Sequence, residues 1–317
     1  MTDSNGAADS RTWPHHELGK ELSNWGRWGD DDEIGTLNFV TPEKRVAAAR
    51  LVTTGKNFDL GMAFDKDGPF TPGGFRTNPQ HVMTLLPSDT AGCPDGMISA
   101  DDMVVLGLQS ATQWDSLAHV GYDGLFYNNV PARAVNSFVG AAKNSFAKAV
   151  EHLISRGVLL DIAALKGVDR LPDSYEITAA DLSAAEERQG VRVESGDILC
   201  LRTGSYQWFL EGDREHFMGD EPGPGLDTCR WLYDREVAAL ALDNWACEVY
   251  PCPIEGAIIP FHQVAIRDMG LTLGEMFNFE SLAADCAQDG DWEFLFCAPG
   301  LKVTGSVGSP VTPMALK

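Results

Sequence analysis

The sequence predicts a mixed α/β or α+β fold in a single domain. Segments with apolar residues at helical spacing alternate with short apolar runs typical of strands, and residues 291–316 alternate such runs with Gly and Pro turns. No internal repeat and no low-complexity linker divides the 317 residues. Because the N-terminus is polar, we expect residues 1–20 to form a flexible tail and residues 21–317 to form the domain.

The first elements are indicated by their caps and turns. Thr41 before Pro42 predicts the N-cap and first residue of a helix that runs to about residue 53, and Gly55 follows its end. Residues 57–65 are expected to form a strand. Residues 67–80 contain too many Gly and Pro for a regular element, so we expect a long loop there, of the kind that often borders a site.

The later elements alternate between the two types. Helical spacing of apolar residues predicts helices over residues 144–157 and 234–242. Between them, Thr178 as a cap and Gly190 as a terminator predict a further helix. Short β-type apolar runs predict strands at residues 101–109, 158–167 and 196–204.

Composition and charge exclude several classes of partner. Twenty-four basic and 46 acidic residues give a net charge of −22, which repels nucleic acid and anionic lipid. No apolar run approaches the roughly 20 residues that a spanning helix needs, and the N-terminus lacks the pattern of a secretory signal. Seven scattered cysteines without a C-x-x-C pair favour reduced thiols over structural zinc, so we expect a cytoplasmic protein.

Polar side chains crowd together in residues 108–124, where Asp115 and His119 lie four positions apart. Buried polar groups without partners cost free energy, so this stretch is poor core material and favours a site. Together with a distant His262 and Glu275, these residues form a set of oxygen and nitrogen donors suited to Zn²⁺ or Mn²⁺. The other histidines are expected to be solvated, except His81, which follows the Gly/Pro loop; the solvated set is His15, His16, His152 and His216.

Residues 109–119, "QSATQWDSLAH", resemble the motif H-x-G-T-H-x-D-x-P-x-H of the metal-dependent cyclase family, which includes bacterial kynurenine formamidases and isatin hydrolases. Three positions of the motif match and two of its histidines are replaced by Gln; the matches are Thr112, Asp115 and His119, and the replacements are Gln109 and Gln113. Further pieces follow in the family's order, from about residue 75 to the end: a strand ending in Asp161, "RTG" at 202–204, "PFH" at His262, Glu275 and "GSVGSP" at 305–310.

The resemblance implies a swivelling β/β/α fold with a central mixed sheet or barrel flanked by helices, and a homodimer or homotetramer. It also implies a site for a divalent metal, Zn²⁺ or Mn²⁺. Carried over position by position, Asp115, His262 and Glu275 are ligands, Gln113 or water completes the site, and His119 transfers protons. Because a neutral amide is a weaker ligand for zinc than imidazole, the two Gln residues leave open whether the metal is retained.

Three readings follow for function. In the first, the protein is a metal-dependent hydrolase of the amide, cyclic amide or lactone bond of a small aromatic or carboxylate-bearing molecule. In the second, His119 and a carboxylate form a metal-free acid/base pair. In the third, the protein binds a small molecule without catalysis. The sequence has no G-x-S-x-G elbow and no phosphate-binding Gly loop, so nucleophilic and nucleotide-cofactor chemistry find no support.

Residues near the motif are candidates for contact with the substrate. Arg76 is suited to a substrate carboxylate, although it is equally suited to pairing with one of the many acidic residues. The aromatic residues near the motif, Trp114 and Tyr127, suit contact with a flat substrate and equally suit packing in the core. The substrate-binding set is therefore Gln109, Trp114, Tyr127, Arg76 and His81.

Overall fold

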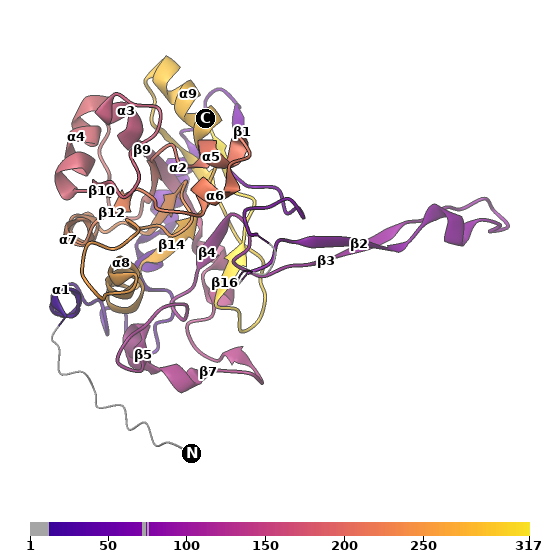
Figure 1. Cartoon of the computed structure of the whole chain (residues 1–317), viewed down its shortest axis with the longest axis horizontal. Helices are drawn as coiled ribbons and strands as arrows, with labels where there is room; N and C mark the ends of the chain where they lie inside the picture. Colours follow the sequence, from indigo (N-terminus) through magenta and orange to yellow (C-terminus); the bar gives the residue numbers. More distant parts are fainter. Residues whose placement is uncertain (1–12, 72–73, 75) are drawn as a thin grey trace.

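The computed structural model describes residues 13–71, 74 and 76–317, and its centre is a nine-stranded sheet that curls into a half-barrel (Figure 1). In spatial order the strands are β1 (Asn57–Asp59), β17 (Met314–Leu316), β15 (Glu293–Cys297), β9 (Ile154–Asp161), β11 (Ile198–Arg202), β13 (Ala239–Leu242), β14 (Thr272–Glu275), β4 (Gln113–Asp115) and β16 (Gly308–Pro310). This arrangement confirms the expected mixed α/β single domain with a central mixed sheet.

The middle of the sheet is parallel and its two sides are antiparallel. Strands β9, β11, β13 and β14 run in one direction, so their carboxyl ends meet at one edge. Strand β4 pairs antiparallel with both β14 and β16, and β15 pairs antiparallel with β9. The buried middle of each of these three strands is apolar, as expected for parallel strands covered on both faces: 157–160 in β9, 198–201 in β11 and 239–242 in β13.

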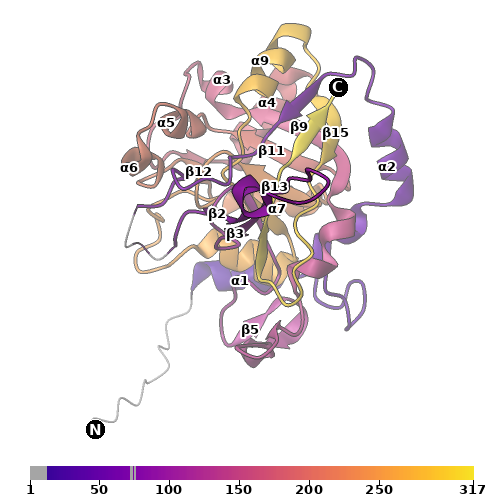
Figure 2. The ribbon, with the colours of Figure 1, turned by 90° about the vertical axis from the view of Figure 1, so that its right-hand side faces the viewer.

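Two hydrophobic clusters cover the two faces of the sheet, and alternate residues of each central strand enter one or the other. Val158 and Leu160 of β9 join the cluster formed with α4, α7 and η7, whereas Leu159 joins the cluster formed with α9. The longer helices are α1 (Pro14–Glu21), α2 (Pro42–Ala49), α4 (Ala179–Gln189), α7 (Asp227–Asp234), α9 (Glu280–Asp289) and the π-helix η7 (Gln263–Met269) (Figure 2).

Short elements connect these layers. Helical segments of three to five residues are α3 (Ile162–Lys166), α5 (Tyr206–Leu210), α6 (Arg214–Phe217), α8 (Pro260–His262), η1 (Gly35–Phe39), η2 (Pro87–Thr90), η3 (Tyr127–Asn129), η4 (Ala132–Ala134), η5 (Phe146–Lys148) and η6 (Val150–His152). The two-stranded sheets are β2 (Gln80–Leu85) with β3 (Asp101–Val105), β5 (Leu125–Phe126) with β6 (Val130–Pro131), β7 (Val135–Asn136) with β8 (Gly140–Ala141), and β10 (Glu176–Ile177) with β12 (Gly223–Pro224).

Two predicted helices are wrong. Residues 144–157 form the turns η5 and η6 and then enter β9, where Gly157 lies under the Phe294 ring. The helix predicted over 234–242 lies one element earlier, as α7, and Ala239–Leu242 is the strand β13. In both cases burial between neighbouring strands overrides helical propensity.

Several predicted boundaries also move. The helix after Thr41 ends at Ala49, the strand expected over 57–65 covers only Asn57–Asp59, and the strand expected over 101–109 ends at Val105. The predicted helix between Thr178 and Gly190 is confirmed as α4, because Thr178 accepts a hydrogen bond from the Asp181 amide and Gly190 adopts a left-handed conformation. The loop predicted over 67–80 gives way to β2 at Gln80, and residues 72, 73 and 75 lie outside the described residues.

Residues 14–20, which were expected to belong to a flexible tail, are part of a helix instead. Residues 14–21 form α1, which packs on η7, and His15 is buried rather than solvated, with its Nε2 3.0 Å from Gln263 Oε1. Residues 1–12 lie outside the described residues. All seven cysteines are free thiols. Within the described part of the chain, no helix is long and apolar enough to cross a membrane.

The close contact at Gly157 gives a testable prediction for stability. A Cβ atom at this position would lie 2.2 Å from Cε2 of the buried Phe294 ring. Gly157→Ala is therefore expected to lower the free energy of unfolding by about 1–3 kcal/mol through overpacking. Denaturant unfolding measures this change, with Gly107→Ala as the control because its nearest neighbour would be 3.6 Å away. Equal stability of the two variants would contradict the packing described for β9.

Candidate metal centre

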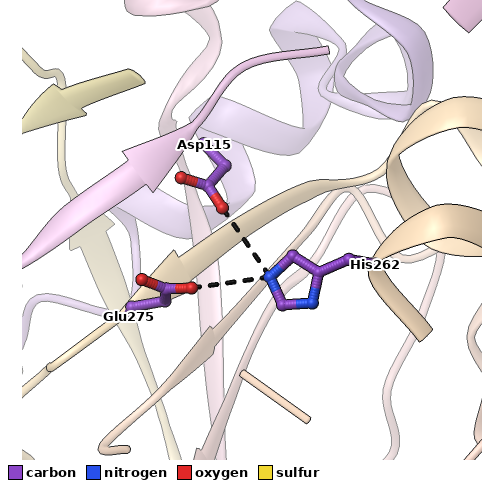
Figure 3. Close-up of side chains that lie close together, drawn as sticks. All are labelled: Asp115, His262 and Glu275. Atoms are coloured by element: carbon purple, nitrogen blue, oxygen red, sulfur yellow. Dashed lines mark ion pairs between the residues drawn. The ribbon is translucent and has the colours of Figure 1, made fainter. Parts of the chain in front are cut away.

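Three buried side chains from separate parts of the sequence point toward one another (Figure 3). Asp115 ends β4, Glu275 ends β14 and His262 ends the short helix α8. The Nε2 atom of His262 lies 3.5 Å from Glu275 Oε1 and 3.8 Å from Asp115 Oδ2. One ligand atom from each residue lies within 4.8 Å of the others, a spacing that suits one shared metal ion.

The pairing of β4 with β14 brings the two carboxylates together. Glu275 stands opposite Gln113 in the register, and Gln113 and Asp115 point to the same face of β4 because side chains alternate along a strand. Trp114 points to the opposite face and packs on Gly274, where a Cβ atom would lie 2.5 Å from the indole ring. Because residue 274 has no side chain, the Trp114 ring can lie directly against β14 on the core side of the sheet. This close contact lets β4 and β14 pair.

His262 is held in place by Glu248, a residue that the sequence did not single out. Its Nδ1 atom lies 2.5 Å from Glu248 Oε1, and the backbone amides of His262 and Phe261 also donate hydrogen bonds to this carboxylate. A carboxylate on Nδ1 leaves Nε2 directed at Asp115 and Glu275, as in metal sites where an outer carboxylate orients a ligating histidine. In the sequence, Glu248 is marked only by being the one charged residue in the otherwise uncharged run "WACEVYP". A charge in such a run, if buried, requires a partner.

The cluster carries more buried negative charge than positive charge. Burial opposes protonation of His262, but hydrogen bonds to Glu248 and Glu275 outweigh burial and raise the pKa of the imidazole to about 10. Burial raises the pKa of Asp115 to about 6, with His119 opposing and Glu275 adding to the shift. The Oδ2 atom of Asp115 is buried and has no hydrogen-bond partner. A divalent cation would satisfy this oxygen and balance the carboxylates.

Gln113 also lies in the cluster, with its amide nitrogen facing the carboxylates. Its Nε2 donates a hydrogen bond to Glu275 Oε2 at 2.6 Å and lies 3.5 Å from Asp115 Oδ1. Its Oε1 atom is buried without a hydrogen-bond partner. In this orientation the amide nitrogen of Gln113 holds the two carboxylates in place. Its oxygen does not point to the place between them where a metal would lie, so Gln113 is not a metal ligand in this arrangement.

His119 stands at the rim of the cluster. Its Nε2 lies 3.7 Å from Asp115 Oδ1, and its side chain is 22% exposed whereas that of Asp115 is fully buried. A turn with a backbone hydrogen bond from His119 to Ser116 carries the chain from the buried strand to this rim. An imidazole that touches both the buried carboxylate and solvent can exchange protons between them.

Arg76 and Gln109 also border the cluster. Arg76 Nη1 lies 4.0 Å from Glu275 Oε2 and donates a hydrogen bond to the backbone oxygen of Gln109, and its guanidinium lies over the Phe70 ring. Phe70 also lines a cavity of about 270 Å³ together with Thr71, Gly74, Arg214, Glu215, Met218 and Trp245. The side-chain nitrogen of Gln109 is buried without a partner and lies against Gly308, where a Cβ atom would be 2.5 Å away.

Three of the residues expected to contact substrate lie elsewhere. Trp114 is buried in the core against Phe277, and its indole nitrogen donates to a backbone oxygen. Tyr127 is also fully buried, with its hydroxyl donating to Asp32. His81 lies on the exposed strand β2 and pairs with Asp102 of β3 at 2.7 Å. The cluster therefore brings together the expected Asp115, Gln113, His262, Glu275, His119, Arg76 and Gln109 but not these three.

Comparison with known proteins gives one matching family and several similar structures. Residues 58–249 match the protein family described as "Putative cyclase". The chain is similar to a solved structure described as a novel cyclase, with 40% identity and a TM-score of 0.85, over 93% of this chain and 100% of the other. None of the curated proteins shows significant similarity to this chain.

Two more distant structures share the fold. An isatin hydrolase bound to the product analogue thioisatinate has 19% identity and a TM-score of 0.59, over 87% of this chain and 99% of the other. Isatin hydrolase A from Ralstonia solanacearum has 21% identity and a TM-score of 0.60, over 87% of this chain and 98% of the other. At these identities the likeness extends to the arrangement of the sheet and helices.

Proposed function

This chain belongs to the cyclase family, and from that premise we propose that it is a metal-dependent hydrolase of an amide, cyclic amide or lactone bond. The observation that carries the proposal is the buried cluster of Asp115, His262 and Glu275. Two carboxylates and one oriented imidazole at this spacing are a common ligand set for a catalytic divalent metal. The isatin hydrolases that share the fold act on a compound of the proposed bond class.

The residues present fit a single divalent ion. Asp115, Glu275 and the Nε2 atom of His262 would hold it, and the unpartnered Asp115 Oδ2 is the oxygen that most requires a cation. Two oxygen ligands to one nitrogen favour Mn²⁺ over Zn²⁺, because softer donors are absent from the set. Such an ion would supply Lewis-acid polarisation of a carbonyl group and make water a stronger nucleophile.

The proton transfers are assigned to His119. Its Nε2 is 3.7 Å from Asp115 Oδ1 and its ring reaches solvent, so it can take a proton from the attacking water and return it to the leaving nitrogen or oxygen. Asp115 orients the imidazole and stabilises its protonated form. Glu248 and Gln113 act on the other groups of the cluster, by holding His262 and Glu275 respectively.

Arg76 is assigned to a carboxylate on the substrate. Its guanidinium lies at the edge of the cluster, where it can bind a carboxylate with two hydrogen bonds, and Phe70 beneath it opens into the 270 Å³ cavity. Phe70 and Trp245 line this cavity and suit an aromatic ring. We therefore propose a small substrate with an aromatic part and a carboxylate near the scissile bond.

The role of Arg76 gives a prediction for substrate selectivity. Arg76→Lys is expected to raise KM for carboxylate-bearing substrates about tenfold with kcat nearly unchanged, because one charge-assisted hydrogen bond is worth about 1.5–3 kcal/mol. Steady-state kinetics with matched acid and ester substrates measures the effect. The ester serves as the control, since it lacks the negative charge. An equal change in KM for both substrates would show that Arg76 does not bind the carboxylate.

A panel of amides, cyclic amides and lactones tests the reaction class. We expect the purified chain to hydrolyse members of the panel, to lose activity after treatment with a chelator, and to regain it when Mn²⁺ or Zn²⁺ is restored. Turnover that survives complete removal of metal would favour the metal-free acid/base mechanism. Absence of turnover in metal-loaded protein that still binds members of the panel would favour a binding protein.

A further inference from the structure

Gln109 carries a buried side-chain nitrogen that none of the roles assigned above uses. Among the described residues, neither this Nε2 atom nor Asp115 Oδ2 has a hydrogen-bond partner. Buried polar groups without partners cost free energy, so such atoms commonly mark a place where another molecule binds. The Asp115 oxygen suits a cation, whereas an amide N–H is a donor and suits an oxygen atom. The Gln109 amide therefore lacks an acceptor from the chain itself.

Gly308 makes room for this amide on the face of the sheet where the cluster lies. Gly308 of β16 stands directly opposite Asp115 of β4, and the side chains of opposite residues point to the same face. A Cβ atom at position 308 would lie 2.5 Å from Gln109 Nε2, so the amide nitrogen fills the space of the missing side chain. Opposite Cβ positions are about 4.5–5.5 Å apart, which sets Gln109 Nε2 beside the Asp115 side chain.

The chain around Gln109 is held in place before any substrate binds. The backbone oxygen of Gln109 accepts a hydrogen bond from Arg76 Nη1 at 3.1 Å. The next residue, Ser110, is buried, and its amide and its hydroxyl both donate to the Gly107 oxygen. Ala111 is buried as well. A donor on so constrained a backbone needs little reorganisation when charge develops beside it, which is the condition for electrostatic catalysis.

Gln109 also contacts the two groups to which parts of the substrate are assigned. Arg76, which holds the Gln109 backbone oxygen, is assigned to the substrate carboxylate, and Asp115 belongs to the cluster at which the scissile bond would lie. The oxygen of the scissile carbonyl gains negative charge when water attacks the carbon. The carboxylates of Asp115 and Glu275 would oppose this charge, so a neutral donor that faces the oxygen lowers the free energy of the charged state.

We propose that Gln109 is a catalytic residue whose Nε2 donates a hydrogen bond to the oxygen of the scissile carbonyl and stabilises the oxyanion. This inference rests on the proposed function, because it assigns a residue to the same hydrolysis. When water attacks, a carbon–oxygen bond forms, the π electron pair of the C=O bond moves to the carbonyl oxygen, and His119 takes the proton of the water. The pair then returns, the bond from carbon to the leaving nitrogen or oxygen breaks, and His119 gives its proton to the leaving atom.

Gln109→Met tests the donor, because methionine has a similar length and cannot donate a hydrogen bond. For the best substrate of the panel described above, we expect kcat and kcat/KM to fall together by about 10²–10³-fold while KM stays within about twofold. Calorimetric titration should give the same Mn²⁺ affinity for the variant and the wild type, since Gln109 is not among the proposed ligands. Gln207→Met is the control and should keep wild-type kinetics, because Gln207 is also partly buried but donates to Glu280 outside the cluster.

A tetrahedral analogue tests the contact without turnover. A phosphonate analogue of the same substrate carries a charged oxygen where the oxyanion would form. We expect Gln109→Met to weaken binding of this phosphonate by about the same factor as it lowers kcat/KM, because both quantities report stabilisation of the charged oxygen. Calorimetry on the metal-loaded wild type and the metal-loaded variant measures the two affinities.

Three results would overturn the proposal. Wild-type kcat in Gln109→Met would show that the amide only packs on Gly308 or holds a buried water. Loss of Mn²⁺ affinity together with kcat would make Gln109 a support of the metal site. An unchanged affinity for the phosphonate would place the oxyanion elsewhere. A wild type that hydrolyses no member of the panel would contradict the proposed function itself, and the inference with it, before any variant is compared.

Discussion

Replacement of Asp115 by Asn is expected to abolish divalent-metal binding and hydrolysis together. Asp115 Oδ2 is the buried oxygen without a partner, and loss of its charge leaves Glu275 as the remaining carboxylate ligand beside His262. Calorimetric titration with Mn²⁺ and metal analysis measure the loss. Glu248→Gln should show a weaker effect, about 10–100-fold in metal affinity, because Glu248 acts through the orientation of His262.

Asp243→Asn is the matched control for this variant. Asp243 is also a fully buried carboxylate whose pKa burial raises to about 6, but it accepts hydrogen bonds from Thr203 and Gly204 and lies outside the cluster. The Asp243→Asn variant should keep the metal even if the substitution lowers the free energy of unfolding. Full metal binding by Asp115→Asn, or equal loss in Asp243→Asn, would contradict the assignment of the site.

Replacement of His119 by Ala is expected to lower kcat by about 10²–10⁴-fold while the fold and the metal content remain. The ring is partly exposed at the rim of the cluster and contacts Asp115 at 3.7 Å, so its removal deletes the proton carrier and leaves the three ligands in place. Steady-state kinetics and metal analysis of the same preparation separate the two effects. His81→Ala is the control, because His81 lies on the exposed strand β2 and pairs with Asp102.

The outcome for His119 also separates acid/base chemistry from ligation. Undiminished turnover in His119→Ala would remove the proposed role. Loss of metal together with activity would make His119 a ligand rather than the proton carrier. Rescue of His119→Ala by added imidazole would support proton transfer, since a free base can replace the missing group.

The elements with local signals were predictable from the sequence. Thr178 and Gly190 mark the ends of α4 through a side-chain cap and a left-handed residue, both of which depend on a few neighbouring residues. Strand β11 was predictable as an apolar run. Only residues 158–161 of β9 were, because residues 154–157 were predicted as helix and the rest of the predicted strand forms α3 (Ile162–Lys166). Ala239–Leu242 was not, because a run of Ala and Leu is compatible with a helix and with a buried strand, and only its neighbours β11 and β14 decide.

The candidate site was predictable in its residue types and less so in its geometry. The order of Asp115, His262 and Glu275 along the chain indicated a shared site, and the structure brings them together. The alternation along the three residues of β4 decides that Asp115 faces the cluster and Trp114 faces the core. This alternation could not be predicted, because so short a strand has no readable period. Glu248 reaches His262 only through the folded loop between them.

Location of the metal tests the central claim most directly. Crystals of the wild-type protein grown with Mn²⁺ and measured near the manganese absorption edge should show one anomalous peak between Asp115, His262 and Glu275. Metal–oxygen and metal–nitrogen distances there should be about 2.0–2.3 Å. An anomalous peak at another place would contradict the account. So would the absence of any peak, if the same protein is active without metal.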